Sequence, residues 1–127
     1  MKTCRVTMAT VADGKKTEII RDGKMFLADN RAELVYTEEN ATITLVFDKG
    51  AVYIERQGDY TMRLTLKKGE KCNGMLGIGG AEGQVQTQTS RLAYSLTENS
   101  LMLSLHYDLF VGNEPQNIRL RLFSKIV

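Results

Sequence analysis

Apolar and polar residues alternate along almost the whole chain, with the two-residue period of strands that have one buried side. No stretch sustains the i, i+3, i+4, i+7 spacing of apolar residues that an amphipathic helix needs. The longest apolar face consists of Leu101, Leu103, Leu105, Tyr107 and Leu109. The pattern therefore predicts an all-β protein.

Residues typical of tight turns separate the alternating segments. Asp13-Gly14, Glu39-Asn40 and Lys49-Gly50 each follow such a segment, as hairpins require. Asp22-Gly23 instead falls inside a longer alternating run, where it marks either a bulge in one strand or a hairpin between two. Six of the eleven glycines lie between Gly69 and Gly83, so we expect this segment to be a mobile lid or rim.

About eight to ten strands in 127 residues predict one domain, residues 1–127. A sheet of this size exposes unpaired hydrogen-bonding groups at its edges unless it closes on itself. We therefore expect a single antiparallel up-and-down β-barrel. The interior of a small barrel is either filled by side chains or holds one small ligand, so inward-facing polar residues become the candidates for function.

Composition narrows the classes of protein. Hydrophobic residues make up 43% of the chain and charged residues 25%, as in soluble globular proteins. Seventeen basic and fifteen acidic residues give a net charge of +2, too weak to imply a nucleic acid or an anionic membrane as partner. The chain begins without the apolar run of a signal peptide, so a cytoplasmic location is expected, with Cys4 and Cys72 as free thiols.

Three segments resemble the YwiB-like family of bacterial proteins, which has no assigned reaction. They are Val52-Tyr-Ile-Glu-Arg-Gln-Gly58, Gly83-Gln-Val-Gln-Thr-Gln-Thr89 and Leu103-Ser-Leu-His-Tyr-Asp-Leu-Phe-Val-Gly112. The similarity extends over about residues 3–126. It implies a lipocalin-like, or calycin, β-barrel and names no substrate.

Arg56 is the first candidate site residue. It continues the phase of Val52 and Ile54, so its side chain is predicted to point into the barrel. A buried guanidinium needs a partner. That partner is either the carboxylate or phosphate of a ligand, or a structural carboxylate such as Glu38.

Four further residues are candidates for the ligand-binding set. Thr87 and Thr89 form a polar stripe in phase with Val85, and their hydroxyls bind either a ligand or groups within the sheet. Tyr36 and Tyr107 fall on apolar strand faces, where they line a cavity or complete the core. Tyr94 is a candidate on the same grounds.

The sequence does not favour catalysis. His106, the single histidine, alternates with an apolar face and is expected on the outer surface, without an assigned nucleophile. Gly77-Ile-Gly-Gly80 lacks the Lys-Ser/Thr ending of a phosphate loop. We predict no catalytic residue, no metal site and no cofactor. Lys67, Lys68 and Lys71 form a basic turn without interleaved aromatic residues, so no nucleic-acid partner is expected either.

Three functions remain open. The leading one is a binding module that holds a small, partly apolar, anionic ligand on Arg56. The second is a filled barrel that acts through its outer surface, as a protein or RNA interaction module or a homodimer; a basic patch or an apolar face at Val46, Phe110 and Phe123 would favour it. The third is an enzyme in which Arg56 meets a second titrating group such as Glu38.

Overall fold

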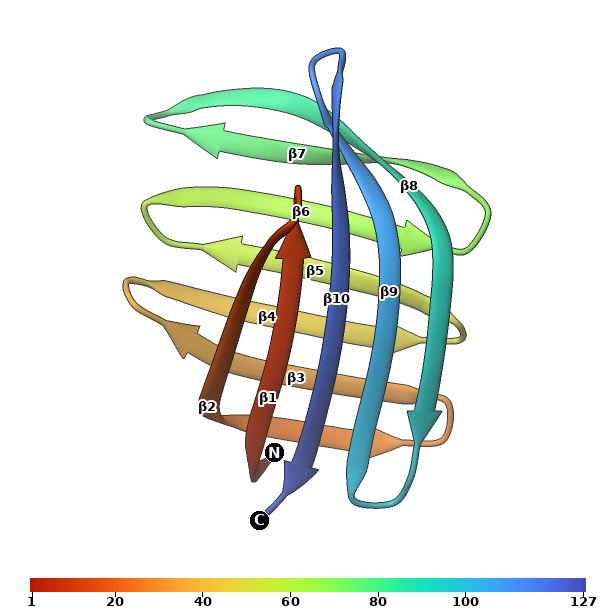
Figure 1. The fold of residues 1–127 in the computed structure, drawn as a ribbon. Helices are drawn as coiled ribbons and strands as arrows, with labels where there is room; N and C mark the ends of the chain where they lie inside the picture. Colours follow the sequence, from red (N-terminus) through yellow and green to blue (C-terminus); the bar gives the residue numbers. More distant parts are fainter.

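A computed structural model describes residues 1–127 and contains ten β-strands (Figure 1). Every strand pairs with its neighbours in antiparallel fashion, and the order β1-β10-β9-β8-β7-β6-β5-β4-β3-β2 closes on itself. The predicted up-and-down barrel is confirmed. The chain has no helix long and apolar enough to cross a membrane. The strands are β1 (Lys2–Ala12), β2 (Lys15–Ala28), β3 (Arg31–Glu38), β4 (Ala41–Asp48), β5 (Ala51–Gln57), β6 (Tyr60–Lys67), β7 (Lys71–Ile78), β8 (Ala81–Leu96), β9 (Ser100–Val111) and β10 (Glu114–Ile126).

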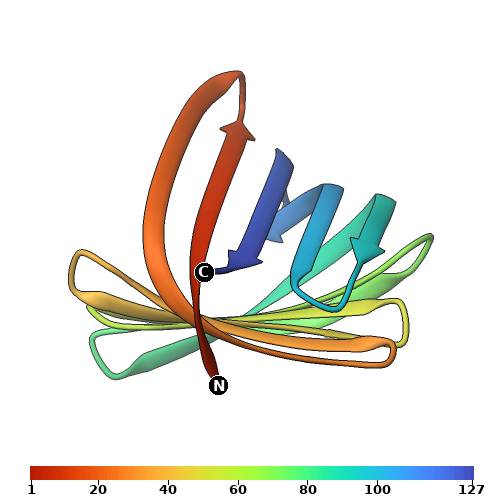
Figure 2. The same cartoon turned by 90° about the horizontal axis from the view of Figure 1, so that it is seen from below.

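The barrel is flattened into two layers whose strands cross (Figures 1 and 2). One layer contains β1, β9 and β10, which run upright in Figure 1, and the other contains β3 to β7, which run across it. The two long strands β2 and β8 belong to both layers, because each pairs with one layer in its first half and the other in its second. They form the two corners of an orthogonal sheet packing.

Gly23 forms the corner in β2. Its position is shared by both layers, since it pairs with Cys4 on β1 and with Tyr36 on β3. A Cβ atom at this position would lie 2.7 Å from the carbonyl oxygen of Val35. The Asp22-Gly23 pair therefore marks a bend in one continuous strand, and no hairpin forms there. In β8 the equivalent change of direction occurs at a bulge between Thr89 and Arg91.

Each corner strand pairs on only one side along part of its length. Lys15–Asp22 of β2 pairs only with β1, and Arg91–Leu96 of β8 pairs only with β9. At these two places the layers diverge, so side chains between them are reached from solvent. Figure 2 shows the β1–β2 hairpin standing away from the other layer.

Side chains from both layers fill the middle of the barrel. The predicted apolar face of β9 is buried throughout, from Leu101 to Leu109. It belongs to a core of 22 buried residues that also includes Phe47 and Met25. Both cysteines are free; Cys4 is buried in this core and Cys72 is half-buried. Space inside the barrel is therefore confined to its ends.

The glycine-rich segment is part of the barrel wall. Residues 71–78 form β7, which pairs with β8 along its whole length, and Gly79 and Gly80 form the following turn with φ of 58° and 85°. The prediction of a mobile lid is wrong. Glycine is needed here because β7 passes so close to β6 that a Cβ on Gly74 would collide with the carbonyl oxygen of Arg63.

Candidate functional site

A cavity of about 290 Å³ opens inside the barrel near the turns that join β3 to β4 and β5 to β6. Ten of its thirteen lining residues are hydrophobic, and the other three are charged. It lies between the two layers, since β1, β9 and β10 supply one wall and β3 to β6 the other. The lining residues are Met8, Tyr36, Glu38, Glu39, Ile43, Leu45, Ile54, Arg56, Tyr60, Met62, Leu64, Tyr107 and Leu120.

Arg56 supplies the single guanidinium of this cavity, and its side chain is only 18% exposed. It forms an ion pair with Asp59 at 2.8 Å and donates a hydrogen bond to the carbonyl oxygen of Tyr60 at 2.9 Å. The guanidinium also lies 3.7 Å from the centre of the Tyr60 ring. The structural partner of Arg56 is thus Asp59, and the expected pair with Glu38 is not formed. The tight turn after β5 explains this, because it folds the chain back so that the carboxylate of Asp59 meets the guanidinium of Arg56.

The ion pair is asymmetric in its exposure to solvent. The Asp59 side chain is 70% exposed. The hydrogen bond from Arg56 holds the pKa of Asp59 below its ordinary value. Arg56 therefore reaches out of an apolar cavity to a carboxylate that is mostly in water.

Two tyrosines bring hydroxyl groups to the same cavity. Tyr36 donates a weak hydrogen bond to the sulfur of Met8 at 3.9 Å. Burial raises its pKa far above the ordinary value, and the carboxylate of Glu38 raises it further. Burial alone raises the pKa of Tyr107 to about 12. Both phenols therefore stay protonated near neutral pH and are available as hydrogen-bond donors.

The acidic residues Glu38 and Glu39 lie at the turn between β3 and β4, on the lining of the cavity. With Asp59 they make the surroundings of Arg56 net negative when all four groups are ionised. A ligand with several negative charges would therefore be repelled, whereas a single acid group directed at Arg56 is compatible with this arrangement.

Thr87 and Thr89 do not line the cavity. Both are fully buried within the wall. The Thr87 hydroxyl donates a hydrogen bond to the carbonyl oxygen of Thr65 at 2.6 Å, whereas the Thr89 hydroxyl has no partner. The structure thus brings together Arg56, Tyr36 and Tyr107 but separates the two threonines from them.

Tyr94 also lies elsewhere. It is 48% exposed and stacks on Phe47, with the ring centroids 4.4 Å apart. It lines a wider, more open hollow between residues 27–30 and 94–98, next to the free edge of β8. Only four of the nine residues there are hydrophobic. This hollow is less suited to an apolar ligand than the Arg56 cavity.

Sequence reasoning missed several members of the site. Glu39 and Tyr60 belong to turns or strand ends, so strand alternation said nothing about their direction. Met8 and Met62 lie on apolar strand faces, and alternation within one strand does not connect them to Arg56. The apolar set Val46, Phe110 and Phe123 does not form one face, because Val46 lies on β4 in the other layer and Phe123 is paired with Met102, eight residues before Phe110 on β9.

Comparison with solved structures agrees with the fold. The crystal structure of the YwiB protein from Bacillus subtilis is similar to this chain with a TM-score of 0.86 and 19% sequence identity. The alignment covers 99% of this chain and 92% of that one. At this identity the likeness shows a shared fold. It confirms the β-barrel fold that the resemblance to the YwiB-like family implies.

No curated protein matches the sequence. One family model, described as a domain of unknown function (DUF1934), matches residues 3–122 and so takes in all the strands from β1 to β9 and most of β10. The chain therefore belongs to the DUF1934 family.

Proposed function

We propose that this protein binds a small, partly apolar molecule in the cavity at Arg56, with the guanidinium anchoring an acid group of the ligand. The observation that carries the proposal is a single, mostly buried guanidinium in an otherwise largely apolar cavity of about 290 Å³. Ligand pockets in proteins begin at roughly this size and combine apolar walls with a few fixed polar groups.

The ion pair with Asp59 leaves Arg56 able to accept a ligand. A guanidinium carries five N–H donors, and the two contacts described above engage two of its nitrogens. Because Asp59 is largely in water, exchanging its carboxylate for that of a ligand costs little. The Tyr60 ring keeps the guanidinium plane in place during the exchange.

The other polar groups of the cavity indicate which chemical groups the rest of the ligand carries. Glu38 and Glu39 favour a hydrogen-bond donor or a positive group on the part of the ligand nearest them. The buried residues Tyr36 and Tyr107 add hydroxyl groups to the apolar lining. A monocarboxylic acid with an aliphatic or aromatic body fits this distribution. Binding inside a barrel is also the mode that the predicted lipocalin-like relationship implies.

Octanoate is a suitable probe, and methionine methyl resonances are a suitable readout. Met8 and Met62 line the cavity, whereas Met102 is exposed on the outer surface. In protein labelled at the methionine methyl carbons, we expect octanoate to shift the Met8 and Met62 signals with saturation and to leave Met102 unchanged. Octanol, which has the same chain without the charge, should bind about ten-fold more weakly.

Two variants make this experiment decisive. Arg56→Gln should weaken octanoate binding about ten-fold and leave octanol unchanged. Asp59→Asn should strengthen octanoate binding, because it removes the competing carboxylate. The proposal is overturned if octanoate leaves Met8 and Met62 unchanged, or if octanoate and octanol respond alike to both variants. Native mass spectrometry of the purified protein would show whether a cellular ligand of this class is retained.

The surface-acting alternative also has an observation in its favour. The outer face of β8, β9 and β10 carries a basic cluster that is independent of the cavity. It supports an interaction with a second partner through the outer surface.

A further inference from the structure

Four basic side chains lie together on the outer face of β8, β9 and β10. Arg91 on β8 is directly opposite His106 on β9, which is in turn opposite Arg119 on β10. Arg121 is the next outward residue of β10. The three arginines are exposed and His106 is half-buried. A row of basic side chains therefore crosses three strands.

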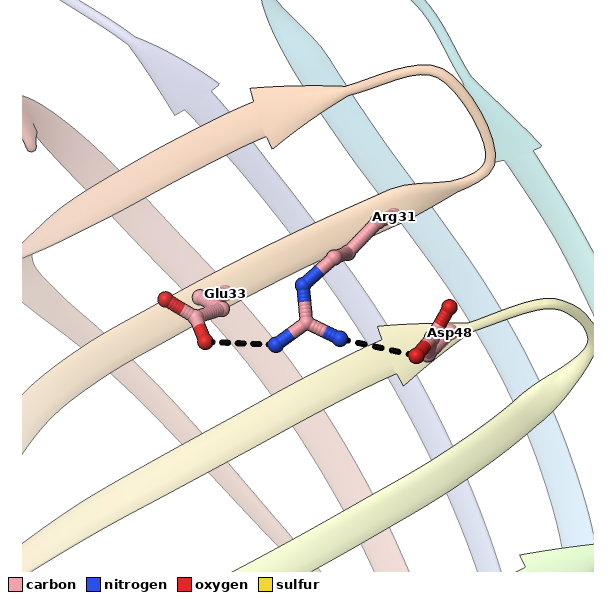
Figure 3. A network of polar contacts seen from close by, with 3 residues as sticks. All are labelled: Arg31, Glu33 and Asp48. Atoms are coloured by element: carbon pink, nitrogen blue, oxygen red, sulfur yellow. Dashed lines mark hydrogen bonds and ion pairs between the residues drawn. The ribbon is translucent and has the colours of Figure 1, made fainter.

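No carboxylate neutralises these arginines. None of them takes part in the six ion pairs of the structure. Arg91 donates a hydrogen bond to the hydroxyl of Ser104 at 3.3 Å. Arg31 shows the contrasting case, because Glu33 and Asp48 each hold one of its nitrogens at 2.8 Å (Figure 3).

The electrostatic effect of the cluster is visible at His106. Burial lowers the pKa of this imidazole, and the positive charges of Arg119, Arg91 and Arg121 lower it further. The nearest acid on the outward side of the same strand is Asp108, whose carboxylate accepts a hydrogen bond from Asn117 at 3.1 Å. All three guanidinium groups thus act on one region of the surface.

The outward side of β10 extends the basic row lengthwise. After Arg119 and Arg121 it presents Phe123, which is 46% exposed, and then Lys125. Alternate residues on a strand are about 7 Å apart, so the four side chains form a ladder about 20 Å long. Ser104 lies beside this ladder on β9, opposite Arg121, and its small side chain leaves the surface accessible.

We propose that this face binds single-stranded nucleic acid, with Arg91, Arg119 and Arg121 on phosphates and Phe123 stacked on an unpaired base. Guanidinium groups bind phosphate oxygens in bidentate fashion. Exposed aromatic side chains flanked by positive charge are the usual platform for unpaired bases. An acidic protein would complement the arginines, but it would leave the exposed Phe123 ring between Arg121 and Lys125 without a role.

The pattern was not visible as a run of basic residues in the sequence. On β10 the outward basic residues alternate with the buried Ile118, Leu120 and Leu122. Arg91 and His106 are added only by the pairing of strands. The expectation of no nucleic-acid partner rested on net charge and on the basic turn at Lys67, Lys68 and Lys71, and neither of these reveals the arrangement on β8, β9 and β10.

Fluorescence anisotropy with a labelled 12-nucleotide oligouridylate tests the proposal on the full chain. We expect saturable binding that weakens as salt rises from about 50 to 200 mM. The double substitution Arg119→Gln, Arg121→Gln should weaken binding at least about ten-fold and reduce the salt slope by about 1.4, since each single-strand phosphate contact contributes about 0.7. Phe123→Ala should weaken binding about ten-fold with little change in salt slope.

A matched control removes the same charge elsewhere. Lys67→Gln with Lys68→Gln takes two positive charges from the end of β6 and the turn after it, and should change affinity less than about two-fold. Circular dichroism confirms that each variant is folded. The proposal is overturned if the wild-type chain shows no saturable binding at 50 mM salt, or if the control loses as much affinity as the arginine variant. It is also overturned if a 12-base-pair duplex binds as well as the single strand, or if polyglutamate of equal charge displaces the oligonucleotide equally well.

Discussion

The hydroxyl of Thr87 on β8 bonds to the carbonyl oxygen of Thr65 on β6, although β7 lies between these strands in the order of the barrel. The link forms because β7 pairs with β6 only between Tyr60 and Arg63. Beyond Arg63 the Thr65 carbonyl has no backbone partner on β7, and the Thr87 hydroxyl donates the hydrogen bond to it instead. Thr89 is buried equally well two residues later, yet its hydroxyl has no partner.

This difference predicts opposite effects for two identical substitutions. Thr87→Val leaves the Thr65 carbonyl without its donor and should lower the free energy of unfolding by about 1 to 2 kcal/mol. Thr89→Val replaces an unsatisfied hydroxyl by a methyl group and should be neutral or stabilising by up to about 1 kcal/mol. Urea denaturation of both variants measures the difference. Equal destabilisation would show that the Thr87 bond adds nothing.

The corner of β2 predicts a steric effect at Gly23. A Cβ atom there would meet the Val35 carbonyl oxygen at 2.7 Å, so Gly23→Ala should destabilise the barrel by about 1 to 3 kcal/mol. Gly83 is the matched control, because its nearest neighbour would be 3.9 Å from an added Cβ. Gly83→Ala should be neutral or slightly stabilising. Thermal unfolding compares the two, and similar losses of stability would contradict the role assigned to the corner.

The ion pair at Arg56 predicts a pH effect at Asp59. The pKa of this carboxyl is lowered from its ordinary value of 3.8, first by the hydrogen bond from Arg56. The ionised form therefore stabilises the folded state above pH 3.8, and this contribution is lost as the pH falls through the lower folded-state pKa.

Carbon-detected NMR titration measures this pKa directly. Arg56→Gln should raise it toward 3.8. Octanoate bound at Arg56 should raise it as well, since the ligand would replace Asp59 as the partner. An unchanged Asp59 pKa in Arg56→Gln would show that the ion pair does not persist in solution.

His106 reports on the basic cluster without any ambiguity of assignment, because the chain contains one histidine. Its pKa is lowered from 6.5 by burial and then by Arg119, Arg91 and Arg121. Arg119→Gln should raise this pKa because it removes a neighbouring positive charge. Oligouridylate should raise it too, as bound phosphate favours the imidazolium form. Lys67→Gln, at the end of β6, should have no effect on this pKa. The same shift in both variants would indicate a general charge effect.

Strand identity and the direction of side chains followed from the sequence alone. Leu101 to Leu109 were assigned to one buried face because side chains on a strand point alternately to its two sides, and the structure buries all five of these residues. The turn at Lys49-Gly50 was also predicted, and both residues adopt the positive φ that such short hairpin turns require. Strand faces and short turns depend only on residues that are close together in the sequence.

Which side chains lie beside one another on neighbouring strands depended on the tertiary structure. The alternation along a strand is unchanged when its register shifts by two residues, so it assigns a residue to a face without choosing its partner. The phase of Arg56 placed it inward and left its partner open, whereas the turn between β5 and β6 brings Asp59 to its guanidinium. For the same reason the row of Arg91, His106 and Arg119 emerged only when β8, β9 and β10 were paired. The sequence determined the strands and their faces, whereas closure of the barrel decided which side chains meet.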